Sequence, residues 1–104
     1  MNAPIENPKS KIANFLAAHS TLALATINAD GLPESAPLFF AVDNDGSILF
    51  VSSPKSRHSL NITADSRAAV TVHNETWTWE EIAGVQMEGE VHHLPAGSGR
   101  EHAW

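Results

Sequence analysis

The apolar residues of this chain fall into short segments, each followed by residues that favour a turn. Thr21–Ile27 is apolar and rich in residues that favour strands, and it ends at Asn28-Ala29-Asp30-Gly31, where Gly31 can take a positive φ. Asn44-Asp45-Gly46 is a second such turn, placed between two further apolar segments. This pattern predicts hairpin-linked antiparallel strands, arranged as a small barrel, and argues against a helical bundle.

Length and composition indicate a single domain with a modest core. The chain has 104 residues, of which 42% are hydrophobic and 17% charged. We therefore expect one domain over 1–104, with a folded core of about 8–94 and a tail at 95–104. No apolar run approaches the roughly 20 residues that a membrane span needs. Without a signal-like start and without cysteine, the expected location is the cytoplasm.

The charge balance limits the partners that this protein can bind. Twelve acidic residues against six basic ones give a formal net charge of −6. Such a field repels nucleic acid and anionic membranes, so we expect neither as a partner. An anionic ligand would bind only where positive charge is concentrated. Lys55 and Arg57 lie close together in sequence inside the expected folded body.

Helical signals occur at two places, and strands are expected between and after them. Asn7 and Pro8 are typical of a helix start, and Ile12, Phe15 and Leu16 then share one face, with the helix fading near His19-Ser20. Ser53-Pro54 repeats that start signal and predicts a helix over about 55–63 with Leu60 and Ile62 facing inward. Further strands are expected at Leu38–Val42, Ile48–Val51, Ala68–His73 and Val85–Leu94, with an edge, bulge or strand entry at Glu34–Pro37.

The segment from Ser52 to His58 is the strongest candidate site. It contains hydroxyls and two cations, Lys55 and Arg57, at the expected start of a helix. Cations are disfavoured there because the helix N-terminus already carries partial positive charge, unless an anion binds. A phosphate held by serine hydroxyls, backbone N–H groups and the arginine is one interpretation. The alternative is a solvated helix start in which Arg57 pairs with a nearby carboxylate.

Other chemistry-bearing residues give weaker signals. His92 and His93 are adjacent, so on a strand they face opposite sides and cannot share a metal, and no metal site is expected. No catalytic residue can be assigned, because no nucleophile motif is present. Trp77 and Trp79 would share one face of an extended segment, as part of a subunit interface, a ring-stacking wall or the core. Gly84 and Gly89 suggest bulges or close backbone contacts.

Four segments together resemble a known family. They are Leu24-Ala25-Thr26 with the turn Asp30-Gly31-Leu32-Pro33, then Leu49-Phe50-Val51-Ser52, then Ser56-Arg57-His58, then Gly84-Val85-Gln86-Met87-Glu88-Gly89-Glu90-Val91. Their order and spacing resemble the pyridoxamine 5′-phosphate oxidase-like split barrels, and the last segment is most similar to small members of uncertain function. The resemblance implies a mostly β split barrel with small helices, assembled as a homodimer that binds FMN at the subunit interface.

The resemblance also implies which residues would hold the cofactor. The flavin ring would lie against Pro37, Leu38, Phe39 and Phe40, and the phosphate would be held by Ser52, Lys55, Ser56, Arg57 and His58, the last standing where lysine is usual. Ala36 and Ala41 occupy positions where the oxidases have cations that grip FMN, and Gly84 stands for a glutamine near the ring.

These departures restrict the function that the resemblance implies. The substrate-binding region of the oxidases is absent, so vitamin B6 oxidation is not implied. The last helix and strand usual in the family are also absent, so the barrel is naturally short or is completed by a partner. The expectation is a flavoprotein, with redox chemistry on an unknown substrate. The alternative is a non-catalytic split barrel that has lost FMN or binds haem or a deazaflavin.

Overall fold

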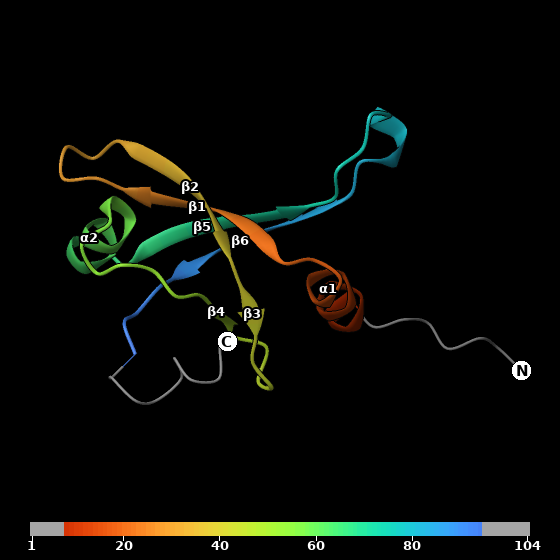
Figure 1. Ribbon diagram of the computed structural model, residues 1–104, viewed down its shortest axis with the longest axis horizontal. Coiled ribbons are helices and arrows are strands. Elements are labelled where there is room, and N and C mark those ends of the chain that lie inside the picture. Colours follow the sequence, from red (N-terminus) through yellow and green to blue (C-terminus); the bar gives the residue numbers. More distant parts are fainter. Residues whose placement is uncertain (1–7, 95–104) are drawn as a thin grey trace, which may run out of the picture.

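The fold is a four-stranded antiparallel sheet accompanied by a two-stranded hairpin and two short helices (Figure 1). The computed structural model describes residues 8–94, so the expected helix cap Asn7 and the expected tail lie outside the described residues. The elements are α1 (Pro8–Ala17), β1 (Thr21–Ile27), β2 (Pro33–Phe39), β3 (Ala41–Val42), β4 (Ile48–Leu49), α2 (Arg57–Ala64), β5 (Arg67–His73), the 3₁₀ helix η1 (Trp79–Glu81) and β6 (Gly84–Glu90). The large sheet has the order β2-β1-β5-β6, and β3 pairs with β4.

One face of the large sheet, here called the inner face, carries the core. Leu22 and Leu24 of β1 and Val72 of β5 point to this face and are fully or almost fully buried. Leu16 of α1 and Ile62 of α2 pack against them in the same apolar cluster. Both helices therefore cover the same side of the sheet, and each buries a single large apolar residue there.

The opposite face, here called the outer face, is bare in the described chain. Cross-strand partners share a face, so Ala25, Ser35, Ala69 and Glu88 lie together on the outer face. Ser35, Ala69 and Glu88 are exposed, and Ala25 of the central strand is only half-buried. No helix among residues 8–94 packs on this face, which contains an open hollow of about 630 Å³ lined in part by Ala25, Ala69 and Glu88.

The strand boundaries differ from the expected ones around the second strand. Strand β2 begins at Pro33 rather than Leu38, and the chain leaves the large sheet at Phe40 before β3 begins. Pro33 and Pro37 are tolerated because β2 is an edge strand, as the edge interpretation of this segment predicted. Strand β4 is shorter than expected, and β6 begins at Gly84 and ends at Glu90.

Glycine conformations explain two turns and one close contact. Gly31 and Gly46 have φ values of +80° and +89°, as expected for their hairpin turns. At Gly84 a Cβ atom would lie 3.1 Å from the carbonyl oxygen of Val72, so the close backbone contact predicted there is confirmed. The prediction for Gly89 was wrong, because a Cβ there would meet nothing within 4 Å and the β5–β6 pairing continues without a bulge.

The connection between β5 and β6, residues 74–83, extends away from the sheet and is here called the arm (cyan in Figure 1). Trp77 lies in a bend and Trp79 begins η1, so the two rings do not share an extended face. Their exposed fractions are 105% and 78%, which excludes the core-packing interpretation within the described chain. The remaining interpretations are a subunit interface and a ring-stacking wall.

Replacement of a central core residue tests this architecture. Leu24→Ala removes the side chain of a residue with no exposed surface, and we expect the free energy of unfolding to fall by about 3 kcal/mol. Leu32→Ala is the matched control, since Leu32 is 58% exposed and its loss should change stability by no more than about 0.5 kcal/mol. Urea unfolding measures both. Equal effects of the two changes would contradict the assignment of the inner face.

Candidate functional site

The start of α2 lies later in the chain than the sequence signal suggested. The N-cap is Ser56, whose hydroxyl accepts a hydrogen bond of 3.4 Å from the N–H of Ser59. Ser53, the expected cap, closes a turn instead, because its carbonyl oxygen accepts the Ser56 N–H at 3.0 Å. Arg57 is therefore the first helical residue and Lys55 lies before the cap, so the prediction of two cations in the first turn was wrong.

Three of the predicted phosphate ligands meet at this helix start. The hydroxyls of Ser52 and Ser56 are 3.2 Å apart, and Nε2 of His58 is hydrogen-bonded to both, at 3.1 Å from Ser56. The Ser59 hydroxyl lies 2.8 Å from that of Ser56 and is buried. We call Ser52, Ser56, His58 and Ser59 the hydroxyl cluster. Ser59 was not predicted, although its place three residues after the cap was a usable signal.

The imidazole within the hydroxyl cluster is biased towards its neutral form. Burial lowers the pKa of His58 below its ordinary value, because the charged ring would lose hydration. Both serine contacts are made with the same nitrogen, Nε2, which in the neutral ring is either an acceptor or an N–H donor, depending on the tautomer. The hydroxyl cluster thus provides polar atoms without a fixed charge of either sign.

The Arg57 side chain pairs with a carboxylate outside the hydroxyl cluster. Its Nη2 atom lies 3.2 Å from Oε2 of Glu34 on β2. The alternative in which Arg57 pairs with a nearby carboxylate is therefore confirmed for the chain as it stands. Lys55 is exposed, and its backbone N–H donates to the Ser53 hydroxyl.

Glu34 is held from several sides. The Nδ2 atom of Asn61 donates to Oε1 of Glu34 at 2.9 Å, and Nδ2 of Asn28 donates to Oε2 at 3.4 Å. These bonds, with that of Asn61 the largest cause, lower the pKa of Glu34 below its ordinary value, and Arg57 adds to the effect. The carboxylate is thus ionised at neutral pH and anchored to the sheet.

The buried face of α2 also differs from the expected one. Asn61 is buried and donates at 3.0 Å to the hydroxyl of Thr26, which is 2% exposed. Ile62 is buried as expected, but Leu60 is 58% exposed, so its predicted inward orientation was wrong. The helix turns Ser59, Asn61 and Ile62 towards the sheet, and Leu60 consequently faces away.

The residues predicted to line a flavin ring divide between the two faces of β2. Pro37 and Phe39 point to the outer face and are exposed, with Phe39 61% exposed. Leu38 and Phe40 are half-buried and pack against the core cluster. A ring on the outer face could therefore contact only Pro37 and Phe39. Ala36 lies on the inner face, opposite Leu24.

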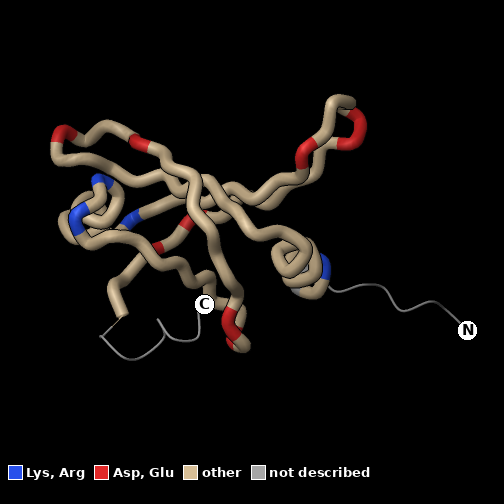
Figure 2. Tube along the Cα trace, in the orientation of Figure 1, with Lys and Arg blue, Asp and Glu red and all other residues tan. Residues whose placement is uncertain are grey.

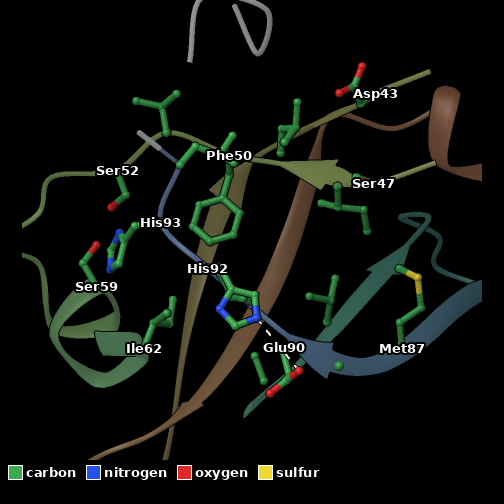
Figure 3. A pocket seen from close by; sticks show the side chains of 18 of the residues that line it. Asp43, Ser47, Phe50, Ser52, Ser59, Ile62, Met87, Glu90, His92 and His93 are labelled. Carbon is green, nitrogen blue, oxygen red and sulfur yellow. Dashed lines mark ion pairs between the residues drawn. The ribbon is translucent and has the colours of Figure 1, made fainter. Parts of the chain in front are cut away.

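A groove of about 1000 Å³ opens between the β3–β4 hairpin, α2 and the inner face of β5 and β6 (Figure 3). Its apolar wall includes Phe50, Ile62 and Met87. Its charged lining residues are Asp43, Asp45, Glu88 and Glu90, and no lysine or arginine is among the described residues that line it. Ser52 and Ser59 of the hydroxyl cluster also line the groove, so it extends to the start of α2.

Both adjacent histidines line this groove (Figure 3). They were predicted to face opposite sides of a strand, which was wrong because β6 ends at Glu90, before either residue. Nε2 of His93 is 3.0 Å from the Thr63 hydroxyl, and Nε2 of His92 is 3.9 Å from a carboxylate oxygen of Glu90. Within residues 8–94, no three metal-ligating side chains gather into a site.

Comparison with known proteins identifies the family. The family model described as pyridoxamine 5′-phosphate oxidase matches residues 8–104. The chain therefore belongs to the pyridoxamine 5′-phosphate oxidase family. No curated protein matches the sequence significantly. In the described part of the chain, neither helix is long and apolar enough to cross a membrane.

Solved structures with the same fold include one uncharacterised protein and two heme proteins. The conserved hypothetical protein Rv2991 from Mycobacterium tuberculosis is 30% identical, with a TM-score of 0.73 over 86% of this chain and 54% of its own. The heme storage protein HutZ from Vibrio cholerae is 17% identical, with a TM-score of 0.75 over 89% of this chain and 67% of its own. A heme binding protein from Mycobacterium smegmatis is 20% identical, with a TM-score of 0.76 over 96% of this chain and 42% of its own.

These matches confirm the expected fold class, a mostly β split barrel with small helices. At such low identities the two heme proteins share the fold alone. The chain covers about half the length of Rv2991, so what the whole of a longer relative does is not carried over to this protein.

Ser53 and Ser56, the expected and the observed N-cap of α2, provide a test of the site. Ser56→Ala removes the hydroxyl that caps α2, and we expect a loss of about 1 kcal/mol in the free energy of unfolding. Ser53→Ala is the matched control, because its exposed hydroxyl accepts one turn hydrogen bond and should contribute within about 0.5 kcal/mol. Denaturant melts followed by circular dichroism compare the two. A larger loss at Ser53 would place the cap where the sequence signal suggested.

Proposed function

We propose that this protein binds FMN, with the phosphate held at the start of α2. The observation that carries the proposal is the meeting of Ser52, Ser56 and His58 beside Arg57, in a chain of this family. The residues present fit a phosphate monoester, because the hydroxyl cluster offers O–H and N–H donors, and Arg57 and Lys55 lie next to it in the chain. Bound FMN would supply electron transfer to a small substrate that remains to be identified.

The flavin ring would lie against the outer face of β2. Pro37 and Phe39 provide the exposed apolar surface there, and β2 also carries Glu34, which faces Arg57. Glu34 and α2 lie on the inner face, so the cofactor would pass round the free edge of β2 from the ring to the phosphate. Ala36 and Ala41 supply no positive charge, and each absent charge-assisted bond should cost about 1.5–3 kcal/mol of phosphate binding. A weakly bound, exchangeable cofactor is therefore expected.

The bare outer face supports a homodimer. The described core contains only five buried large apolar residues, all on the inner face. A second subunit on the outer face would bury Ala25 and Ala69 and would cover a ring lying against Phe39. Each FMN would then contact two chains. In this arrangement the partner subunit completes the cofactor site of each domain. The exposed tryptophans of the arm would be available to contact that subunit.

Substitution of Arg57 tests the FMN site. Arg57→Ala should weaken FMN binding at least tenfold, about 1.4 kcal/mol, because a phosphate contact is removed. Flavin fluorescence quenching measures the dissociation constant, and Lys11→Ala is the control, as it removes a positive charge from α1. Riboflavin, which lacks the phosphate, should bind with equal affinity to the wild-type protein, to Arg57→Ala and to Lys11→Ala. A change in FMN affinity smaller than about threefold would exclude Arg57 as a phosphate ligand.

Assembly is tested by a charge placed on the outer face. The wild-type chain should sediment as a dimer at micromolar concentration, and Ala69→Glu should sediment as a monomer, because a buried unpaired carboxylate is costly. Leu60→Glu is the control, since Leu60 is exposed on α2, which covers the inner face. A wild-type monomer, or a dimer that Ala69→Glu leaves intact, would contradict the proposed interface.

A second candidate function is a split barrel without FMN, binding haem, a deazaflavin or no cofactor. Two similar structures are named as heme proteins, and Ala36 and Ala41 weaken the case for a phosphate. The visible spectrum of the purified protein separates the candidates, since flavin bands, a Soret band or a colourless protein are distinct outcomes. Mass spectrometry of the native protein would identify the bound molecule.

A further inference from the structure

We propose that Glu34 is a positioning residue that holds Arg57 away from the phosphate site and so limits the affinity for phosphate monoesters. This inference rests on the proposed FMN site. It assigns a role to a carboxylate that belongs neither to the hydroxyl cluster nor to the residues expected to contact the flavin. The ion pair with Arg57, at 3.2 Å, is the contact that would do this.

The two partners of the ion pair are held very differently. Glu34 is only 25% exposed and accepts hydrogen bonds from the side chains of Asn61 and Asn28. Asn61 is in turn bonded to the buried hydroxyl of Thr26 on the central strand. The Arg57 side chain is 83% exposed, with Glu34 as its ion-pair partner. The carboxylate is therefore the fixed partner, and the arginine is the one that moves.

A phosphate at the hydroxyl cluster must compete with this fixed carboxylate. To reach the phosphate, Arg57 has to leave Glu34 or bridge the two groups. In the first case Glu34 loses its cation, and in the second a phosphate dianion comes close to a carboxylate. Either arrangement makes the free energy of phosphate binding less favourable. Lys55 lies before the helix cap and is not tied to a carboxylate among the described residues, so it stays available as a second cation.

The charged residues are unevenly distributed over the described chain. In Figure 2 the basic residues lie at α2, at the start of β5 and on α1, whereas the charged residues of the arm are all acidic. Asp30, at the tip of the β1–β2 hairpin, is another acidic residue on the same hairpin as Glu34 but forms no ion pair within residues 8–94. Comparison of Glu34 with Asp30 therefore separates the specific contact from the general effect of negative charge.

The experiment measures FMN and riboflavin affinities for a set of variants. Glu34→Gln keeps an oxygen that can accept the Asn61 hydrogen bond but removes the charge, so the fold should persist, as a thermal melt will check. We expect FMN to bind about threefold to fivefold more tightly to Glu34→Gln, the range of an exposed ion pair, with riboflavin unchanged. Asp30→Asn should leave both affinities unchanged. In an Arg57→Ala background, Glu34→Gln should have no effect on FMN.

The possible outcomes separate this inference from the proposed function. If wild-type protein prefers FMN to riboflavin but Glu34→Gln binds FMN no more tightly, the role of Glu34 is excluded and the FMN site stands. An equal gain from Asp30→Asn, or a gain that persists without Arg57, would also exclude it, since the effect would not pass through the ion pair. If wild-type protein shows no preference for FMN over riboflavin, the phosphate site itself is absent and both proposals fail.

Discussion

Asn61 makes the contact on which the candidate site depends. Its buried amide donates to Thr26 on β1 and to Glu34 on β2, and so docks α2 against two strands at once. A helix of eight residues is too short to be stable on its own, so its position must come from such tertiary contacts. The rotation that buries Asn61 also buries Ser59 and Ile62. It thereby determines where the hydroxyl cluster and Arg57 lie.

The far end of α2 is fixed by a second polar contact. Arg67 donates two hydrogen bonds to the Asp65 carboxylate, at 3.0 and 2.8 Å, where the helix passes into β5. This pairing lowers the pKa of Asp65 to about 2. The arginines at the two ends of α2 thus differ in the position of their acidic partners. Arg67 and its acidic partner are near neighbours in the chain, whereas the partner of Arg57 lies on a different strand and is itself held by two asparagines.

Local signals predicted the elements but not the contacts between them. Strand β1 and the turns at Gly31 and Gly46 follow from residues within each segment, and they were predicted correctly. The start of α2 was misplaced because Ser53 and Ser56 both satisfy the local rule for a cap. The choice between them depends on which hydroxyl reaches a free N–H in the folded chain. The start of β2 was misplaced because prolines argue against a strand until its edge position is known.

The same distinction applies to the candidate site. Ser52, Ser56 and His58 lie within seven residues, so their meeting could be predicted from the chain direction and the helix start. The identities of Glu34, Asn61 and Thr26 could not, because their contacts join α2 to two strands distant in sequence. That Arg57 would find a carboxylate was foreseen as an alternative. Which carboxylate, and that it would be anchored, required the folded sheet.

The groove and the start of α2 adjoin each other, because Ser52 and Ser59 of the hydroxyl cluster line the groove. At the β3–β4 end of the groove, Asp43 and Asp45 contribute negative charge, and no arginine or lysine is among the described residues that line the groove. The phosphate of FMN and the propionates of haem would both be repelled there. The start of α2 differs, because it combines the neutral donors of the hydroxyl cluster with Lys55 and with Arg57, which is paired with Glu34. We therefore expect an anion at the α2 end of the groove rather than beside the β3–β4 hairpin.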